Sequence, residues 1–234
     1  MVRKLAYSVS EREHWISGVG GVVGILLVWL ISFQALGGHA AVLVATSMGS
    51  TAVLLFAAPH GPMSQPWAVF GGHLVSALIG VACVQWLGHD LMLAAAFAVG
   101  LSITAMYSLR CLHAPGGATA LGAVLGGTTV HAMGYAFLLP IMLNAIVILA
   151  VAIAFNYPFP WRRYPYALAK RKSPKSEKAM IPHSRLVYAL SQIDTFVDIC
   201  EEDLQRIYEL AMRDEPAAAQ TATTGNLAAQ STRA

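Results

Sequence analysis

A short string of histidine, proline, glycine and threonine offers the clearest chemistry in this sequence. It reads His113-Ala114-Pro115-Gly116-Gly117-Ala118-Thr119 and contains no charge. Proline sets the first turn of a helix, and the glycines let a ligand or a second backbone approach closely. The N–H groups at such a helix start can hold a small anion. We therefore expect an anion site here, built from Pro115, Gly116, Gly117, Thr119 and His113.

Residues 59–66 form a second uncharged polar stretch, in which three prolines among eight residues exclude a continuous helix. Its Ser64 and Gln65 can both donate and accept hydrogen bonds. The stretch either folds back into the protein and lines a path, or forms a tight loop at the membrane surface. His73 follows inside an apolar run, where an ionisable side chain is a functional candidate. The alternative for His73 is a neutral ring bonded to a neighbouring carbonyl.

Three further polar residues complete the candidate site: Ser50, Thr51 and Asn144. The string Gly49-Ser50-Thr51-Ala52 resembles Gly117-Ala118-Thr119-Ala120 in the second half of the chain. Such a match is typical of an inverted repeat with a substrate site at the repeat interface, although small residues also serve helix packing alone. Asn144 lies inside an apolar run and either joins helices or contacts solute.

The pattern of acidic residues, histidines and cysteines does not favour an enzyme. Between Trp15 and Trp161 the only acid is Asp90, so no carboxylate pair is available. No two histidines have the i, i+4 spacing of a zinc pair, and the three cysteines are far apart. We expect no catalytic residue, metal or cofactor.

The composition indicates an integral membrane protein. Of the 234 residues, 56% are apolar and only 12% charged, and the only charges between Trp15 and Trp161 are Asp90 and Arg110. The mean hydropathy is +0.59. Soluble domains carry about 25% charged residues. This pattern excludes a nucleic-acid binder, a disordered chain and an ordinary cytosolic enzyme.

The apolar runs predict an all-α bundle with six crossings, because a bilayer takes about 20 helical residues to cross. Five runs are clear, at residues 15–36, 40–58, 69–88, 91–109 and 133–156. The segment 113–130 is ambiguous, since it contains proline and several glycines and either crosses as a broken helix or re-enters. Basic residues stand before the first run, after the fourth and after the last. They lie on the same side of the membrane only if 113–130 crosses it. Both termini are then cytoplasmic, with 1–14 preceding a membrane domain at 15–157.

The region after the membrane domain divides into three parts. Residues 158–182 are basic and aromatic, which is typical of an interfacial linker; we expect contact with anionic lipid at 158–178. Residues 183–215 carry apolar positions at alternating spacings of four and three, which predicts an amphipathic cytoplasmic helix that pairs two subunits. Residues 216–234 are rich in Ala, Thr and Gln, and we expect them to be disordered.

The sequence resembles the HPP family of integral membrane proteins over roughly residues 40–157. The resemblance rests on His113-Ala114-Pro115-Gly116-Gly117-Ala118-Thr119-Ala120-Leu121, Ser64-Gln65-Pro66 and the string from Gly71 to Gly80. One departure is that the eponymous His-Pro-Pro reads His113-Ala114-Pro115. The resemblance implies a polytopic protein of bacterial inner membranes or plastid envelopes, and plastid members are associated with nitrite transport.

These observations lead to one functional hypothesis and one alternative. The first is a transporter or channel of the bacterial inner membrane for a small monovalent anion, with nitrite taken from the resemblance. The alternative is a scaffold or sensor that does not transport and acts through its C-terminal helix. Either protein would be a homodimer in our interpretation of the heptad pattern.

Overall fold

The computed structural model describes residues 10–36, 38–168, 204 and 207–208, with the side chains of 35–45 left aside. The described part of the chain up to 168 is helical and contains no strand. Its long elements are α1 (Glu11–Leu36), α2 (Gly38–Ala57), α3 (Pro66–Leu87), α4 (Leu91–Ser108), α5 (Pro115–Leu125), α6 (Gly127–Met133) and α7 (Leu138–Asn156). Three short 3₁₀ turns are η1 (Pro62–Ser64), η2 (Gly134–Phe137) and η3 (Tyr166–Leu168).

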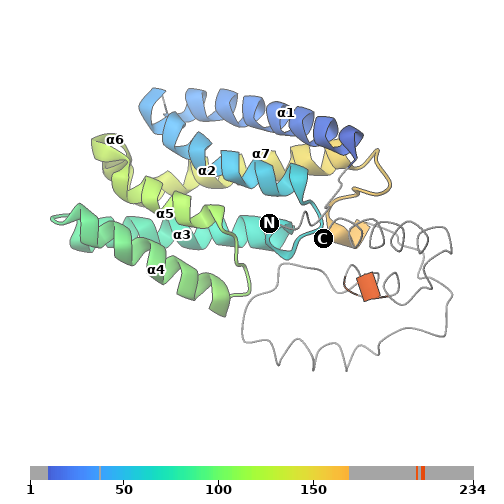
Figure 1. The fold of residues 1–234 in the computed structure, drawn as a ribbon. Coiled ribbons are helices and arrows are strands. Elements are labelled where there is room, and N and C mark those ends of the chain that lie inside the picture. The colour runs from blue at the N-terminus through green and yellow to red at the C-terminus, as the bar shows by residue number, and fades with distance from the viewer. Residues whose placement is uncertain (1–9, 37, 169–203, 205–206, 209–234) are drawn as a thin grey trace, which may run out of the picture. The chain divides into compact units, whose positions relative to one another are not determined.

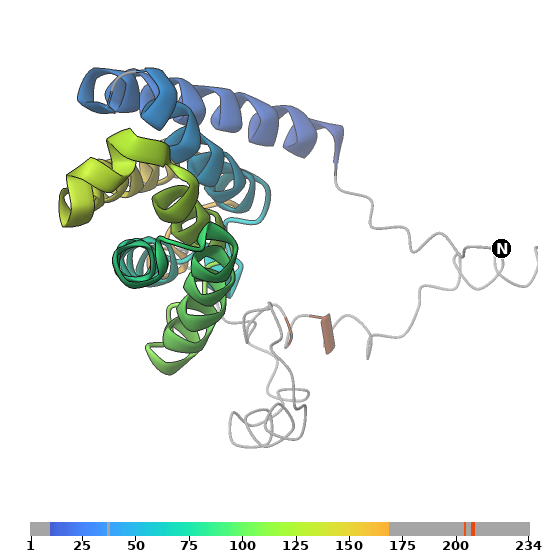
Figure 2. The same ribbon diagram turned by 90° about the vertical axis from the view of Figure 1, so that its left-hand side faces the viewer.

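The helices run alternately up and down in one bundle, with α1 and α4 on opposite sides of it (Figures 1 and 2). Three contacts identify the segments that share one end. Arg162, after α7, bonds Glu13 at the start of α1; Trp67, at the start of α3, bonds the carbonyl of Leu109 after α4; and His113, before α5, bonds the carbonyl of Met63 before α3. We call this the Arg162 end.

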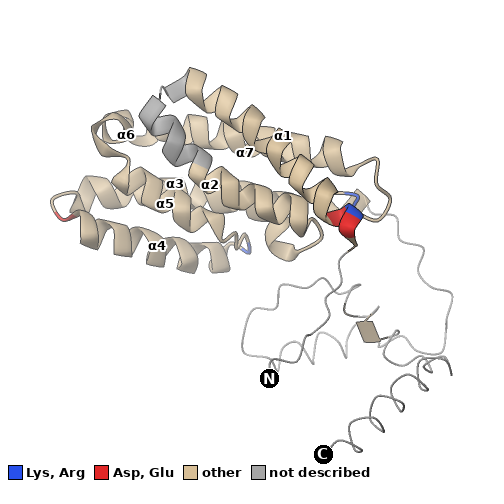
Figure 3. Cartoon of the chain, turned by 45° about the horizontal axis from the view of Figure 1, so that its top comes forward, with Lys and Arg blue, Asp and Glu red and all other residues tan. Residues whose placement is uncertain are grey.

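Charged residues mark the two ends of the bundle (Figure 3). Within the described chain, six of them lie at the Arg162 end: Glu11, Arg12, Glu13, Arg110, Arg162 and Arg163. The opposite end carries Asp90, whose carboxylate accepts hydrogen bonds of 3.1 Å from the N–H groups of Met92 and Leu93 and so caps α4. The basic residues therefore share one end, as the six-crossing prediction requires.

Four helical stretches are long and apolar enough to span a membrane: 11–34, 66–87, 91–108 and 127–156. The described parts of α2 and α5 are shorter apolar helices. Large apolar side chains on the outer faces are exposed, among them Trp29 on α1, Phe97 on α4 and Leu139 on α7. A surface of this kind is suited to lipid rather than water.

The ambiguous segment 113–130 crosses the bundle in two pieces. α5 ends at Leu125, and Gly127, with a φ of +70°, redirects the chain into α6. α6 and η2 then reach the Asp90 end, where a Cβ on Gly134 would lie 3.6 Å from Gln85 Nε2 near the end of α3. The broken helix and the count of six passages through the bundle agree with the prediction, whereas six crossings of a membrane and the inverted repeat stay predictions.

Close helix contacts rely on glycine at a few positions. A Cβ on Gly20 or Gly24 of α1 would lie 2.5 or 2.8 Å from the ring of Phe56, so these glycines let α1 approach α2. A Cβ on Gly80 of α3 would lie 2.8 Å from the carbonyl oxygen of Ala120, so α3 and α5 are in backbone contact. This contact brings α3 and α5 close enough for their polar side chains to meet.

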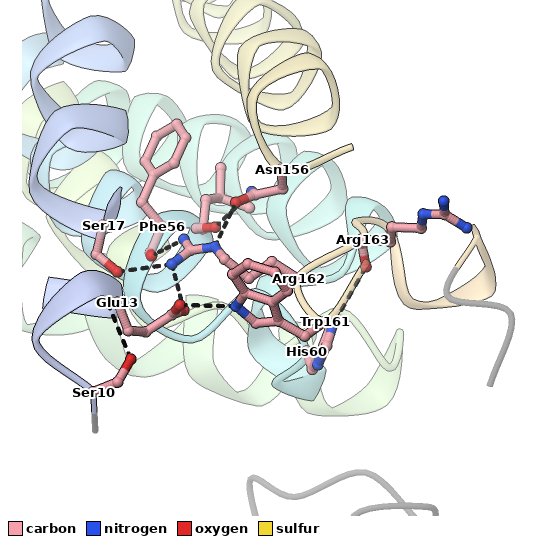
Figure 4. Close-up of polar contacts among 10 residues, drawn as sticks. Ser10, Glu13, Ser17, Phe56, His60, Asn156, Trp161, Arg162 and Arg163 are labelled. Carbon is pink, nitrogen blue, oxygen red and sulfur yellow. Dashed lines mark hydrogen bonds and ion pairs between the residues drawn. The ribbon is translucent and has the colours of Figure 1, made fainter. Parts of the chain in front are cut away.

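The residues after α7 fold back onto the Arg162 end (Figure 4). The Arg162 side chain, only 1% exposed, pairs with Glu13 and also donates to Ser17 Oγ, the Phe56 carbonyl and Asn156 Oδ1. Trp161 Nε1 donates to the second Glu13 oxygen at 3.0 Å. We call these six residues the Arg162 cluster; it joins the ends of α1, α2 and α7.

Two predictions for the C-terminal region can be compared with the structure only in part. Arg162 belongs to the stretch for which we expect lipid contact, yet it lies inside the protein. Basic residues from Lys170 onward fall outside the described residues, as do nearly all of the predicted helix 183–215 and the tail 216–234. Lipid contact and pairing through that helix remain predictions.

Candidate functional site

Four buried side chains from α2, α3, α5 and the connection before α5 form a continuous hydrogen-bonded chain: Thr51, His73, His113 and Thr119. Thr51 Oγ1 lies 2.9 Å from His73 Nε2 and 3.0 Å from His113 Nε2. His73 Nδ1 lies 2.7 Å from Thr119 Oγ1, and His113 Nδ1 lies 2.8 Å from the Met63 carbonyl oxygen. The four are at most 1% exposed. We call this set the His–Thr chain.

The positions of the hydrogen atoms follow from the acceptor at one end. A carbonyl oxygen only accepts, so His113 Nδ1 carries hydrogen and, in the neutral ring, Nε2 is an acceptor. The bond between Thr51 and His113 then forms when Thr51 donates its single hydrogen to His113 Nε2. His73 Nε2 must therefore donate to Thr51 Oγ1, which leaves His73 Nδ1 to accept from Thr119. With both rings neutral, each bond of the chain is made and all point in one direction.

Two glycines allow this chain to form. A Cβ on Gly72 of α3 would lie 2.5 Å from His113 Cβ, so only glycine lets the connection before α5 approach α3 so closely. A Cβ on Gly116 would lie 2.7 Å from Ser76 Oγ and 3.0 Å from the Gly72 carbonyl oxygen. Of the two alternatives expected for Gly116, a ligand or a second backbone, the structure shows the backbone contact.

Two hydroxyls that the sequence analysis missed lie on the helices that pack around α5. Ser76 of α3 is fully buried, and its Oγ contacts only the Met106 sulfur at 3.9 Å. Ser102 of α4 is also fully buried, and its Oγ has no hydrogen-bond partner. Serine is common in membrane helices, so the sequence alone gave no reason to single them out.

The first turn of α5 is closed in this structure. The N–H of Gly116 donates to the His113 carbonyl at 2.9 Å, and that of Gly117 donates to the Ala114 carbonyl at 3.1 Å. Pro115 is buried, whereas Gly117 is half-buried with Val99 at the edge of contact. The N–H groups expected to face an anion are therefore paired within the chain here.

Ser64 and Gln65 hold the 59–66 connection in place. Ser64 Oγ donates to the carbonyls of Ala58 at 2.7 Å and Leu54 at 3.2 Å. Gln65 Nε2 donates to the carbonyls of Pro59 and Gly61, and its Oε1 accepts from the N–H of Tyr166. Both side chains bond backbone groups. Of this connection, it is the Met63 carbonyl that reaches the His–Thr chain.

The remaining two candidates lie apart from the His–Thr chain. Ser50 is exposed and donates to the Ser47 carbonyl of its own helix. Asn144 Nδ2 donates to Ser32 Oγ at 2.7 Å and to the Pro140 carbonyl at 2.9 Å, so it joins α7 to α1. Its Oδ1 has no hydrogen-bond partner. Of the eleven predicted residues, the structure thus brings Thr51, His73, His113 and Thr119 together, with Pro115, Gly116 and Gly117 beside them.

The His–Thr chain contains two histidines but no carboxylate or thiol side chain. Among the described residues, no three His, Cys, Asp or Glu side chains are placed to hold a metal ion. Cys83 and Cys111 are free and buried. What the chain offers is two imidazoles and two hydroxyls that can exchange hydrogen bonds.

Comparison with known proteins identifies the family. The family model described as "HPP, transmembrane region" matches residues 6–165, which include the whole His–Thr chain and the Arg162 cluster. The chain belongs to the HPP family. It is therefore a multi-pass membrane protein, as the four candidate spans and the exposed apolar side chains also indicate.

Two curated proteins of Dictyostelium discoideum, both described only as transmembrane proteins, are similar to this chain. One is 37% identical over 160 residues, covering 66% of this chain and 55% of its own length. The other is 32% identical over 159 residues, covering 66% of this chain and 50% of its own length. The chain spans about half the length of these relatives. No solved structure matches it.

Proposed function

We propose that this HPP protein carries a small monovalent anion, nitrite, across the membrane. The observation that carries the proposal is the His–Thr chain, a connected set of hydrogen-bonding side chains buried between α2, α3 and α5. Polar groups in a membrane interior are costly to keep, and they mark solute paths. His73 lies about 10 Å along α3 from its first residue, at 1.5 Å per residue, so the chain lies inside the membrane domain.

The donors around α5 supply what a small anion loses when it leaves water. Ser76 has only a weak sulfur contact and Ser102 has none, so both hydroxyls can donate to a solute without breaking a strong bond. The hydroxyls of Thr51 and Thr119 can turn toward a solute at the cost of one internal bond each. Neutral donors bind an anion weakly enough to release it, as transport requires.

The choice of nitrite comes from the family resemblance and not from the donor geometry. Plastid members of the HPP family are associated with nitrite transport, and nitrite is a monovalent anion small enough to be held by a few hydroxyls. The departure His113-Ala114-Pro115 keeps the histidine and the second proline, which are the two residues whose side chains are buried here.

The setting of this activity is part of the proposal. We place the protein in a bacterial inner membrane with the Arg162 end toward the cytoplasm, because Arg12, Arg110, Arg162 and Arg163 lie at that end. Contact with anionic lipid at 158–178, homodimer formation through 183–215 and the absence of an enzymatic activity belong to the same proposal. The scaffold alternative depends on the C-terminal helix, which falls outside the described residues.

The test is nitrite uptake by proteoliposomes that contain the purified full-length protein. We expect saturable uptake that exceeds that of chloride and of protein-free vesicles. Thr119→Val should lose most of this uptake, and Thr104→Val is the matched control, since the exposed Thr104 hydroxyl bonds only the Gly100 carbonyl of its own helix. A folded protein that takes up no nitrite would contradict the proposed function.

A further inference from the structure

The His–Thr chain contains a ready alternative hydrogen bond at Thr51. Thr51 Oγ1 lies 3.0 Å from His113 Nε2 and 3.1 Å from the Ser47 carbonyl oxygen, so its one hydrogen can serve either acceptor. The Ser47 carbonyl also accepts from Ser50. A hydroxyl within reach of two acceptors can change between them by rotation about one bond.

This alternative lets His113 accept a proton without losing a hydrogen bond. The proton would bind the lone pair of His113 Nε2, and the new N–H would donate to Thr51 Oγ1. The Thr51 hydrogen would turn to the Ser47 carbonyl, while His73 Nε2 still donates to the same oxygen. His113 Nδ1 keeps its bond to Met63 throughout. No equivalent second acceptor is seen for Thr119, so the geometry favours His113 over His73 as the proton site.

The surroundings of Thr51 and His113 contain no charged side chain that would hold the added proton permanently. The groups that face it are Thr51 and the Ser47 carbonyl from α2, His73 from α3, Met63 from η1, Thr119 from α5, and Met106 from α4 beside Gly72. The connection between α4 and α5 also carries Arg110 and the buried Cys111, which lies beside Gly71. Each Asp, Glu, Lys and Arg of the described chain lies at a helix end or in a connection.

A single charge of either sign is therefore unfavourable at this place. An imidazolium without a counter-ion costs free energy in an apolar interior, and so does an unaccompanied anion. Bound together the two charges compensate, so each should strengthen the binding of the other by the same factor. A proton and an anion that bind as a pair also leave as a pair.

We propose that His113 Nε2 is the binding site of a proton that this HPP protein carries together with its anion, so that transport is electroneutral symport of one proton with one nitrite. The inference deepens the proposed function and rests on it. Thr51 is the hydroxyl that accommodates the proton, and His73 is a positioning residue that holds Thr51.

The experiment measures nitrite and protons in the same vesicles. Proteoliposomes with the full chain enclose a pH-sensitive dye, and potassium with valinomycin fixes the membrane voltage. The external pH is kept alkaline, so that little nitrous acid crosses the lipid by itself, and protein-free vesicles provide the background. We expect added nitrite to acidify the interior in a one-to-one ratio to nitrite uptake, with an initial rate that an imposed voltage does not change.

Three variants identify the site. His113→Gln and Thr51→Val should each lower nitrite and proton uptake together by about tenfold or more, the equivalent of one hydrogen bond to a charged group. Thr51→Ser keeps the hydroxyl and should retain the coupled uptake, which separates a lost proton site from a folding defect. His89→Gln is the matched control, because His89 is exposed beyond the end of α3.

The outcomes separate the two proposals. Voltage-driven nitrite uptake without protons would overturn the symport and leave the proposed function standing. Undiminished proton uptake in a folded His113→Gln variant would overturn the assignment to His113. No saturable nitrite uptake by the folded wild-type protein would overturn the proposed function, and the symport with it.

Discussion

The His–Thr chain and the Arg162 cluster are both buried and polar, yet they differ in charge and in the number of arrangements open to them. The Arg162 cluster contains an ion pair, and its guanidinium bonds four partners on α1, α2 and α7 at once. The His–Thr chain carries no charge when both histidines are neutral, and the Thr51 hydroxyl can donate to either of two acceptors. A charged cluster in which one side chain bonds several helices holds those helices in one arrangement. A neutral chain with an alternative hydrogen bond can change between two hydrogen-bonding arrangements.

Replacing Arg162 should have the largest effect and should fall on stability. Arg162→Met leaves Glu13 without its cation and Asn156 Oδ1 without its donor, and the loss of one partner of a buried ion pair costs about 3–5 kcal/mol. The free energy of unfolding in detergent measures it, with Arg163→Met, a neighbouring half-buried cation, as the comparison. An equal loss in both variants would contradict the role of the cluster.

A methyl group at Gly72 should disturb the His–Thr chain from the backbone side. Gly72→Ala places a Cβ 2.5 Å from His113 Cβ, and overpacking of this kind costs about 1–3 kcal/mol. We expect nitrite uptake to fall sharply, because His113 must move away from Thr51. Gly117→Ala, whose Cβ meets only Val99 at 4.0 Å, should reduce uptake less. The reverse order would shift the site toward the start of α5.

Removal of the Thr119 hydroxyl should impair transport more than stability. Thr119→Val leaves His73 Nδ1 without its donor. We expect nitrite uptake to fall by about tenfold, whereas the free energy of unfolding should fall by only about 1 kcal/mol. Uptake normalised to the amount of folded protein separates the two effects. A variant that unfolds but transports normally when folded would show that the His–Thr chain is structural, like the Arg162 cluster.

Tyr164 offers a pH test of the region around the Arg162 cluster. Its hydroxyl donates to the Ser64 carbonyl at 2.7 Å, and burial raises the pKa of the phenol. The folded state thus favours the neutral phenol, so its stability is full below the unfolded pKa of about 10 and falls as the pH rises above it. Tyr164→Phe should weaken this decline and cost about 1 kcal/mol at neutral pH. Unfolding curves between neutral and alkaline pH measure the loss of stability at neutral pH and its further decline as the pH rises.

Asn144 should show the smallest effect. Asn144→Leu removes a hydrogen bond between α7 and α1, which in membrane proteins is worth about 0.6 kcal/mol on average. We expect nitrite uptake to fall less than in Thr119→Val. Should Asn144→Leu be the more damaging change in the uptake assay, the anion path would pass between α1 and α7 instead.

The sequence predicted the six passages well because apolar runs and basic ends are local signals. The expected runs 69–88 and 91–109 differ from α3 and α4 by at most three residues at either end. The break near Gly127 was signalled by glycine, which tolerates a positive φ. The inverted repeat could not be established from the sequence, because the small residues that suggest it also serve helix packing alone.

The candidate site could be predicted as a set of residues but not as an arrangement. Thr51 was selected through the short repeat, His73 as an ionisable residue in an apolar run and His113 through its place before a helix start. Their meeting depends on the packing of α2, α3 and the connection before α5. Arg162 appeared to be one basic residue among several near the lipid surface. Its burial depends on Glu13, which lies 149 positions earlier, and no local pattern reports that contact.

The distance in sequence between Glu13 and Arg162 has a consequence for how the protein is made. When α1 enters the membrane, the guanidinium that will pair with Glu13 has not yet been synthesised, because it follows α7. Through most of translation the start of α1 and the end of α2 lack their shared cation. The nascent chain therefore closes this end only after α7 and the turn that follows it have been made, so this contact forms late in the folding of the membrane domain.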